Sequence, residues 1–496
     1  MAVETVAPDA ASGRQEEGGE ASRTGSVRMF GLVCYMLGQV ILLCWWAALY
    51  PGLMSNDSRR QMQNVTVGPW GSHHSVAYDL ILGFSYHVTE DIALVTLLQS
   101  VGMAIALSYL ACGLLPLGIH RRWLLAAVGC VVLLPSLASF TLTIWKDVPF
   151  TICGVLLAGT SVRVALQSRS GRYRFDSRVL LLGGELLLLG LFRNNGFLMA
   201  LLAGAVLVLV VRGARRWIAG VTVVAVMVPP LLTGFVYTRF GLVPPLRSFA
   251  FQTVFSDLAV AYVQKPRVLM PEEQKLLEKV ASPQAWKDGA SCYTMGFIVA
   301  HPGFDPSKAE PRMDRIMKLW GTLIWRAPDV IFDARICRAA LAWKIDSTAE
   351  RYGGELYMAT FREPSPLPQW SGTPLATAFT HRPLIEGGWD AARFLIKTTM
   401  VSHLEWLLWR APLWCYLSYV AAALLWWRTG NRAGLALVAV VVGQQLGVIL
   451  TNTAQQARFM MTPIFIGMVL LPFVMRQFRM LLPPRNPEAG HSRVRS

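Results

Sequence analysis

Long apolar runs alternate with short polar connections along most of the chain. A helix that spans a bilayer needs roughly 20 mainly apolar residues, and about ten runs approach that length. They cover approximately residues 29–49, 92–117, 123–142, 147–165, 179–193, 195–211, 216–238, 411–427, 433–451 and 459–475. The pattern predicts an all-α polytopic membrane protein with about 10 transmembrane helices. Pro229 and Pro230 predict a kink within one of them.

Arginine residues gather in alternate connections between these runs, for example at 121–122, 212–216 and 428–432. Cytoplasmic loops of membrane proteins carry an excess of Lys and Arg. We therefore expect these connections and both termini to be cytoplasmic, and the segments 50–91 and 241–398 to face outward. The expected location is the cell membrane, with the active face extracytoplasmic.

The composition agrees with this interpretation. The chain is 54% hydrophobic and only 15% charged, whereas soluble domains carry about 25% charged residues. The formal net charge of +16 is explained by the arginine-rich inner loops, so we expect the lipid bilayer and no nucleic acid as a partner.

Five regions follow from these patterns. Residues 1–28 lack an apolar core and are predicted to form a disordered cytoplasmic tail. Residues 29–240 form an N-terminal transmembrane module whose first outer loop is 50–91. The segment 241–398 is richer in charged residues and turn signals, and we expect one mixed extracytoplasmic domain of helix and loop. Residues 399–478 form the C-terminal transmembrane helices, and 479–496 form a second cytoplasmic tail.

Cys292 and Cys337 are the only cysteines in the outer segment. Disulfides persist in oxidising compartments outside the cytoplasm. Two alternatives stay open, a disulfide between these residues or two independent free thiols.

Polar side chains gather at the outer ends of the predicted helices, in four separate loops. A phosphate requires Arg or Lys donors, and an acceptor hydroxyl requires a carboxylate as general base. We therefore expect a site for an anionic, lipid-linked substrate, although charged side chains also extend from helix ends toward water for solvation alone. The loops contain Asp57-Ser58 with His73-His74, Lys146-Asp147, Arg193-Asn194-Asn195, and Gln455-Gln456-Ala457-Arg458.

Two acidic residues have alternative roles. Asp57 is a candidate base or metal ligand, but Asn56 or Asp57 could instead cap a surface helix. Glu185 lies within an apolar run, where it is a candidate proton carrier of a transporter or an interior acid hydrogen-bonded to Gln444 or Gln445.

The first outer loop also contains His73, His74 and Asp79. Adjacent histidines do not face one way on a helix, so we expect no shared metal site; one of them could contact substrate or be an ordinary loop residue. Asp79 is similarly ambiguous. The sequence contains no Walker A motif and no room for a cytoplasmic nucleotide-sugar domain, so a sugar donor would be lipid-linked.

Several motifs resemble the outer loops of bacterial integral-membrane glycosyltransferases of the GT-C superfamily, of an actinobacterial type and distantly similar to protein mannosyltransferases. They are Tyr50-Pro51-Gly52 followed by Asp57-Ser58 and Gln61, then Trp145-Lys146-Asp147, Arg193-Asn194-Asn195-Gly196 and Ala457-Arg458-Phe459-Met460-Met461-Thr462-Pro463.

The resemblance implies a GT-C-like fold and a polyprenyl-phosphate sugar donor. It implies Asp57 as catalytic base, and Lys146, Arg193 and Arg458 as ligands of the donor phosphate. The remaining candidate substrate-binding residues are Ser58, His73, His74, Asp147, Asn194, Asn195 and Gln455. Ser75 stands where many relatives have a proline after histidine, and Ser58 follows Asp57 where many have a second acid. The role of a divalent cation as cofactor therefore stays open.

The sequence thus predicts transfer of a sugar to an extracytoplasmic acceptor, which is a cell-envelope glycan, a lipid or a protein, with 241–398 helping to choose it. One alternative is a transporter or flippase for a lipid-linked glycan, which uses the same basic face without chemistry. The other is a non-catalytic envelope-assembly protein, in which Asp57 is dispensable. The prediction requires Asp57, Lys146, Arg193 and Arg458 to converge in space.

Overall fold

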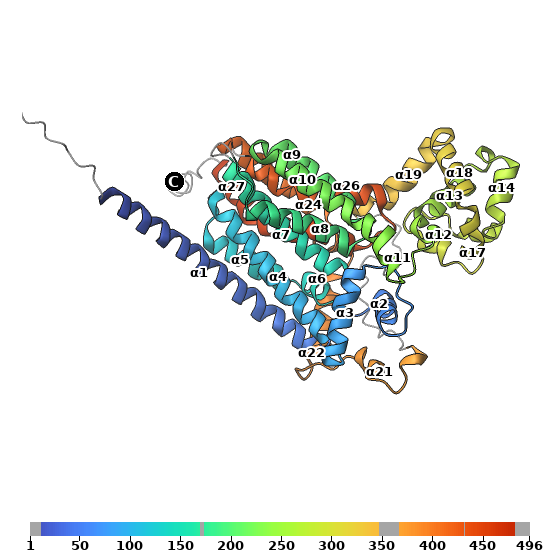
Figure 1. The fold of residues 1–496 in the computed structure, drawn as a ribbon, viewed down its shortest axis with the longest axis horizontal. Coiled ribbons are helices and arrows are strands. Elements are labelled where there is room, and N and C mark those ends of the chain that lie inside the picture. The colour runs from blue at the N-terminus through green and yellow to red at the C-terminus, as the bar shows by residue number, and fades with distance from the viewer. Residues whose placement is uncertain (1–10, 169–172, 347–366, 431, 482–496) are drawn as a thin grey trace, which may run out of the picture.

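The computed structural model describes residues 11–168, 173–346, 367–430 and 432–481 (Figure 1). Over these residues the protein is all-α, and only isolated β-bridges occur. A bundle of long helices makes up most of the molecule. A lobe of shorter helices projects from one end of it (Figure 1), and we call residues 247–343 the outer lobe.

Six segments are long and apolar enough to cross a membrane: Gly25–Ala48, Ala93–Leu117, Asp147–Gln167, Arg212–Arg239, Ala433–Thr451 and Ala457–Gln477. A seventh span results if α5 (Arg121–Leu133) and α6 (Pro135–Thr141), which are bent by 71° relative to each other, count as one. The bend follows from Pro135, because a proline disfavours the helical conformation of the residue before it. Leu134 accordingly has an extended backbone, with ψ 122°.

The prediction of about ten spans is therefore too high. Helices α8 (Ser177–Phe192), α9 (Gly196–Val210) and α24 (Pro412–Thr429) lie where spans were expected. However, α8 and α9 have only 16 and 15 residues, and α24 includes Arg428 and several aromatic residues. The described chain thus supports a multi-pass membrane protein with six or seven candidate spans.

Two further findings concern the predicted tail, residues 1–28, and the segment 241–398. Helix α1 (Ala11–Ala48) begins inside the stretch 1–28 that we expected to be a disordered tail, while residues 1–10 lie outside the described part. The described residues of 241–398 form helices and loops without a strand, so this segment is all-α like the rest of the described chain. Short turn-rich connections, rather than strands, separate these helices.

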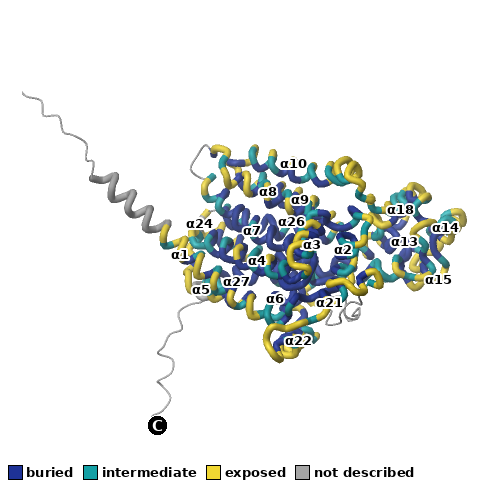
Figure 2. The backbone as a smooth tube through the Cα atoms, turned by 60° about the horizontal axis from the view of Figure 1, so that its bottom comes forward, coloured by how far each residue is buried: buried dark blue, intermediate teal, exposed yellow. Residues whose placement is uncertain are grey.

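The bundle is built around α4 (Ala93–Leu114) and α7 (Asp147–Gln167), which are dark, buried tubes in Figure 2. Helix α1 packs on α4, α8 packs on α7, and α10 (Arg215–Leu231) packs on α8 and α9. A π-helical turn, Leu232–Val236, directly follows the two prolines of α10, in agreement with the irregularity expected there. The C-terminal helices are α25 (Ala433–Leu437), α26 (Ala439–Thr451) and α27 (Met461–Leu481), and the 3-10 turn Ala457–Met460 lies between α26 and α27.

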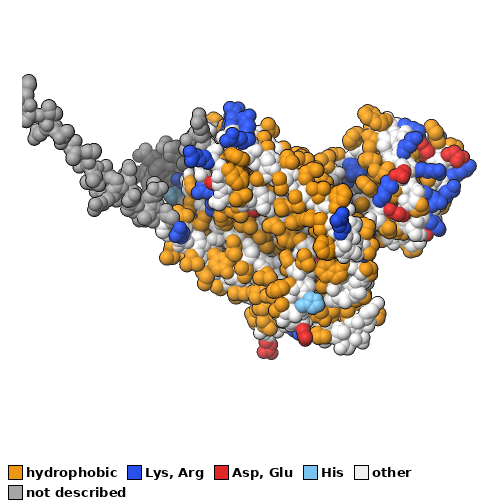
Figure 3. Space-filling view, in the orientation of Figure 1, with side chains coloured by type: hydrophobic (Ala, Val, Ile, Leu, Met, Phe, Trp, Pro, Cys, Tyr) orange, Lys and Arg blue, Asp and Glu red, His pale blue; other side chains and the backbone are white. Residues whose placement is uncertain are grey.

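The outer lobe has its own apolar core, which includes Phe255, Trp286 and Leu323. Charged side chains gather on this lobe, whereas the flank of the bundle is largely hydrophobic (Figure 3). This contrast matches the change in composition along the chain. Its helices are α12 (Arg247–Ala250), α13 (Gln252–Gln264), α14 (Pro271–Glu278), α15 (Pro283–Asp288), α16 (Gly296–Val299), α17 (Pro306–Ala309), α18 (Met313–Arg326), α19 (Pro328–Arg338) and α20 (Ala340–Trp343).

Short helices cover the end of the bundle that faces the outer lobe. They are α2 (Asn56–Thr66), α3 (Val76–Thr89), α11 (Tyr237–Arg239), α21 (Leu375–Ala378) and α22 (Gly388–Thr399), while α23 (Glu405–Leu408) leads into α24. Helices α2 and α3 pack on each other, and α22 packs on α1 and α6. The candidate site lies at this end.

Close helix approach at Gly443 gives a first test of the fold. A Cβ added there would lie 2.8 Å from the Met199 carbonyl oxygen, across the contact of α26 with α9. We predict that Gly443→Ala lowers the free energy of unfolding by about 1–3 kcal/mol through overpacking. Gly220→Ala is the control, because nothing lies within 4 Å of a Cβ added at Gly220. Thermal unfolding of the solubilised protein measures both, and equal melting temperatures would contradict this packing.

Candidate functional site

Charged side chains from four distant loops meet at the end of the bundle. The Arg458 Nη1 atom donates a hydrogen bond to Asp57 Oδ2 at 2.7 Å and lies 3.7 Å from Asp147 Oδ2. On the other side of the same carboxylate, Arg193 Nε lies 3.4 Å from Asp147 Oδ1. These contacts join residues 401 positions apart in the sequence. We call Asp57, Lys146, Asp147, Arg193 and Arg458 the charge cluster.

The start of α2 fixes Asp57. The N-cap is Ser55, whose hydroxyl accepts hydrogen bonds from the backbone N–H groups of Asp57 and Ser58. The expectation that Asn56 or Asp57 caps this helix is therefore wrong. Asp57 instead lies in the first turn, where the helix dipole favours a negative charge. Its side chain is 30% exposed, so part of the carboxylate remains accessible.

The first outer loop is tied directly to the segment that carries Lys146 and Asp147. The Ser58 hydroxyl donates to the Ile144 carbonyl oxygen at 2.8 Å, and the Trp145 indole N–H donates to the Ser55 hydroxyl at 2.7 Å. Backbone hydrogen bonds also join Leu53 to this segment. Ser58 is fully buried, so its position suits the alignment of two loops rather than the substrate contact that we expected.

Aromatic rings support the two arginines. The Arg193 guanidinium lies 4.5 Å from the Phe459 ring centre, and the Arg458 guanidinium lies 5.1 Å from Phe459 and from Trp145. In addition, Arg458 Nε donates to Gln456 Oε1 at 2.8 Å. The predicted site residues did not include Phe459 or Gln456, although Phe459 follows Arg458 directly and Gln456 precedes it by two residues.

Lys146 differs from the two arginines. Within the described residues its ammonium has no hydrogen-bond or ion-pair partner, and the residue is half-buried. Burial lowers the pKa of Lys146, an effect that Asp147 and Asp57 oppose and that Arg458 and Arg193 reinforce. Three cations in the charge cluster thus face two carboxylates. The arrangement carries an excess of one positive charge where an anion could enter.

Burial and the neighbouring cations shift the pKa values of Asp57 and His74. Burial alone would raise the pKa of Asp57, but the charge and hydrogen bond of Arg458, together with Lys146, hold it well below its usual range. Burial and the Lys146 charge lower the pKa of His74. Asp57 is therefore a carboxylate and His74 a neutral imidazole near pH 7.

Several candidate substrate-binding residues lie beside the charge cluster but have other partners. Asn194 donates to the His73 carbonyl oxygen at 3.0 Å, and Asn195 donates to the Thr451 hydroxyl at 3.0 Å. The His73 and His74 rings adjoin each other, with ring centres 4.3 Å apart. These contacts connect the first outer loop to the turn that carries Arg193.

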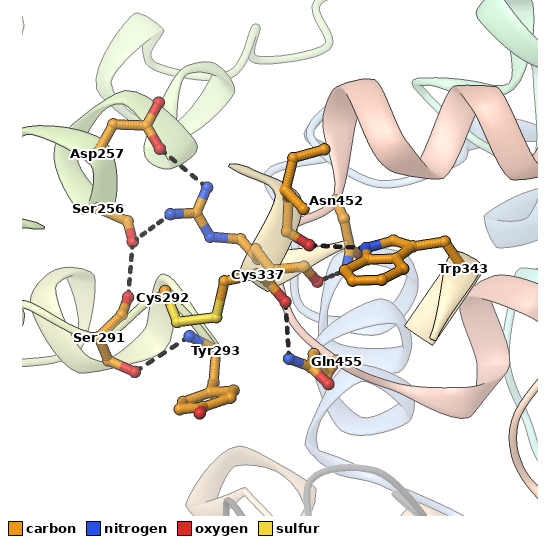
Figure 4. Close-up of a disulfide and its surroundings, with 11 residues drawn as sticks. Ser256, Asp257, Ser291, Cys292, Tyr293, Cys337, Trp343, Asn452 and Gln455 are labelled. Carbon is orange, nitrogen blue, oxygen red and sulfur yellow. Dashed lines mark hydrogen bonds and ion pairs between the residues drawn. A yellow bond between two sulfur atoms is a disulfide. The ribbon is translucent and has the colours of Figure 1, made fainter. Parts of the chain in front are cut away.

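Gln455 faces the outer lobe instead of the charge cluster. Its amide donates to the Cys337 carbonyl oxygen at 2.9 Å. Cys337 forms a disulfide with Cys292, so the structure favours the first of the two alternatives left open for these cysteines. Figure 4 shows Gln455 and Asn452 beside this disulfide. The prediction placed Gln455 in the substrate site, whereas its neighbour Gln456 contacts Arg458.

A buried ion pair lies at the same contact, between the outer lobe and the chain segment 452–455. Arg338 and Asp257 are both fully buried, with Arg338 Nη1 3.0 Å from Asp257 Oδ1, and Asn452 donates to the Arg338 carbonyl oxygen (Figure 4). The backbone N–H of Met295 donates to the Thr453 carbonyl oxygen at 2.9 Å. The outer lobe therefore fixes the backbone immediately before Gln456 and Arg458.

Glu185 lies outside the charge cluster. The Thr160 hydroxyl donates to Glu185 Oε1 at 2.8 Å. Gln444 and Gln445, the partners that we expected, donate instead to the carbonyl oxygens of Phe459 and Ala342. An interior acid hydrogen-bonded across helices is thus observed, with a different partner.

No set of three or more His, Cys, Asp or Glu side chains that could hold a metal ion occurs among the described residues. The fold and the charge cluster define a helical multi-pass membrane protein with an ionic site at one end. No family model, curated protein or solved structure matches the chain. The resemblance to GT-C glycosyltransferases accordingly stays a prediction from the sequence motifs.

Asp79 gives the site a predictable pH dependence. It is fully buried, and Asn64 Nδ2 donates to its Oδ2 at 2.6 Å. Burial raises the pKa of Asp79 to about 7, although Asn64, Lys146 and Gln61 oppose the shift. Because the folded protein then binds this proton more tightly than the unfolded chain, stability falls as the pH rises from about 4 through 7.

We predict that Asp79→Asn removes this loss, so between pH 5 and pH 8 the variant gains about 3 kcal/mol relative to the parent. Melting temperatures across this range measure the effect. Asp314→Asn is the control, because the hydrogen bond from Arg247 lowers the pKa of Asp314 and moves its titration below this range. Parallel pH profiles for the parent and Asp79→Asn would refute the assignment.

Proposed function

We propose that the charge cluster binds the phosphate of a polyprenyl-phosphate sugar and transfers the sugar to an extracytoplasmic acceptor. The observation that carries the proposal is the excess positive charge of the cluster, centred on Lys146, which lacks a partner among the described residues. A phosphodiester carries one negative charge, so one bound donor would balance the excess.

The surroundings favour a lipid-linked substrate. The charge cluster lies at the ends of candidate spans, since Asp147 begins α7 and Arg458 precedes α27. A phosphate at the membrane surface can therefore reach these side chains while its prenyl chain remains in the bilayer. Guanidinium groups bind phosphate oxygens with two parallel hydrogen bonds, and the Phe459 and Trp145 rings hold both arginines in place.

Asp57 has the position of a general base. Its carboxylate is ionised and partly exposed, as deprotonation of an acceptor hydroxyl requires. In the absence of substrate, Arg458 is its ion-pair partner. A phosphate that binds Arg458 competes for this guanidinium, which weakens the ion pair and raises the basicity of Asp57 at the moment when donor is present.

The reaction is a single displacement. The acceptor oxygen attacks the anomeric carbon, and its proton passes to an Asp57 oxygen. The bond between the anomeric carbon and the phosphate oxygen breaks, with its electron pair leaving on the lipid phosphate and with inversion at the carbon. Lys146, Arg193 and Arg458 stabilise the negative charge that develops on that phosphate. The outer lobe, which adjoins this end of the bundle (Figure 1), would help to select the acceptor.

Replacement of the base tests the proposal directly. We predict that Asp57→Asn lowers turnover about 10²–10⁴-fold, the range typical of a lost general base. The measurement is the release of polyprenyl phosphate from a panel of polyprenyl-phosphate sugars by the purified protein. Asp314→Asn serves as control, because this carboxylate is 88% exposed on the outer lobe. Unchanged turnover in Asp57→Asn would exclude it as base, and transbilayer movement of lipid without release would favour a flippase.

Lys146 allows function and stability to be separated. Because burial disfavours its charge, we predict that Lys146→Met has a melting temperature equal to or above that of the parent. Its turnover should fall about 10²-fold through loss of charge stabilisation in the transition state. Lys265→Met, at an exposed ion pair of the outer lobe, should retain full turnover. A strongly destabilised Lys146→Met would instead indicate a structural role.

A further inference from the structure

A cavity lies toward the arginine-rich end of the bundle. It has a volume of about 600 Å³ and lies between α5, α24 and α27. Its walls are largely apolar and include Leu134, Leu408 and Met468, while its polar end is formed by His120, Arg122 and Arg476. Arg476 follows Arg458 by roughly 18 residues, which corresponds to about 27 Å along a helix. The cavity and the charge cluster thus belong to opposite ends of α27.

The depth of the cavity matches one membrane leaflet. Arg122 lies in the first turn of α5, and Leu134 follows the last residue of that helix. Twelve residues of helix rise about 18 Å, and half of a hydrocarbon core is about 15 Å thick. On the α5 side the lining ends at Leu134, directly before the 71° bend between α5 and α6. Its length therefore suits the acyl chains of one phospholipid and is too short for an extended polyprenyl chain.

The cavity is accessible from the side. Trp123 and Met475 on its walls are 43% and 51% exposed, and Ala126 is exposed as well. These residues belong to the membrane-facing surface of α5 and α27, so lipid in the bilayer can enter without crossing a polar barrier.

The polar end complements an anionic headgroup. Arg476 Nη1 donates to the Gly118 carbonyl oxygen at 2.9 Å, which orients its guanidinium and leaves further N–H donors for a ligand. Arg122 lies at the same end of the cavity, and its side chain is exposed. Two guanidinium groups at the end of an apolar channel provide the charge and the shape that an anionic phospholipid requires.

We propose that this cavity binds one anionic phospholipid of the arginine-rich leaflet. Its phosphate contacts Arg122 and Arg476, and its acyl chains extend along the apolar walls toward Leu134. The site is separate from the proposed donor site, because the charge cluster belongs to the other end of α27. Failure of either proposal leaves the other intact.

Native mass spectrometry of the full-length protein tests the proposal, with phosphatidylglycerol and phosphatidylcholine of identical acyl chains as probes. We expect one phosphatidylglycerol to be retained preferentially. Arg122→Gln/Arg476→Gln should weaken its binding about tenfold or more, since each basic residue near a membrane surface contributes roughly 1 kcal/mol. Arg215→Gln/Arg216→Gln, at the start of α10, is the control for general surface charge and should bind as the parent does.

A second variant addresses the apolar part of the site. Ala126→Trp fills the channel without a change of charge and should also weaken phosphatidylglycerol binding about tenfold, as measured by the same titration. Equal retention of the two lipids by the parent, or parent-like binding by both the double-arginine and Ala126→Trp variants, would overturn the proposal. A matched loss in Arg215→Gln/Arg216→Gln would do so too, because binding would then follow surface charge alone.

Discussion

The ion pairs that Arg458 makes with Asp57 and Asp147 are the constraint on which the rest of the site depends. Asp147 is almost fully buried and the arginine side chain is only 10% exposed. Charges withdrawn from water are tolerated only when they are paired in good geometry. The fold must therefore bring the starts of α2, α7 and α27 and the end of α8 to one level. The short hydrogen bonds of Ser55 and Ser58 to the segment 144–145 maintain that register.

The charge cluster contains three cations but only two carboxylates, and within the described chain its ion pairs join only the two arginines to them. In the outer lobe, each buried or partly buried arginine of the junction contacts a carboxylate, since Arg335 and Arg338 both pair with Asp257. Lys146 has no such partner within the described chain, and burial opposes its charge. Both arginines of the structural junction thus contact a carboxylate, whereas Lys146 at the proposed site does not. The arrangement at Lys146 favours an anionic ligand over a structural role.

The sequence predicted the helical membrane class and the loops that meet, because apolar runs and arginine-rich connections encode spans and their direction. It failed where local pattern carries little information. The span count was too high because α8 and α9 are apolar but short. The sequence also did not show whether Gln455 or Gln456 contacts Arg458, since adjacent residues of an extended segment point in opposite directions and no periodic pattern distinguishes them. Ser55 as N-cap was missed although its residue type suits that position.

The chain between α26 and α27 connects the two halves of the proposed mechanism. Asn452 and Gln455 bind the backbone of Arg338 and Cys337 in the outer lobe, and the next residue, Gln456, binds Arg458. The disulfide Cys292–Cys337 and the Asp257–Arg338 pair fix the lobe side of this connection. A lobe that selects the acceptor would therefore share its anchor with the arginine that binds the donor phosphate. A displacement of the lobe would move the backbone next to Arg458, and with it the partner of Asp57, so the proposed mechanism would couple acceptor binding to activation of the base.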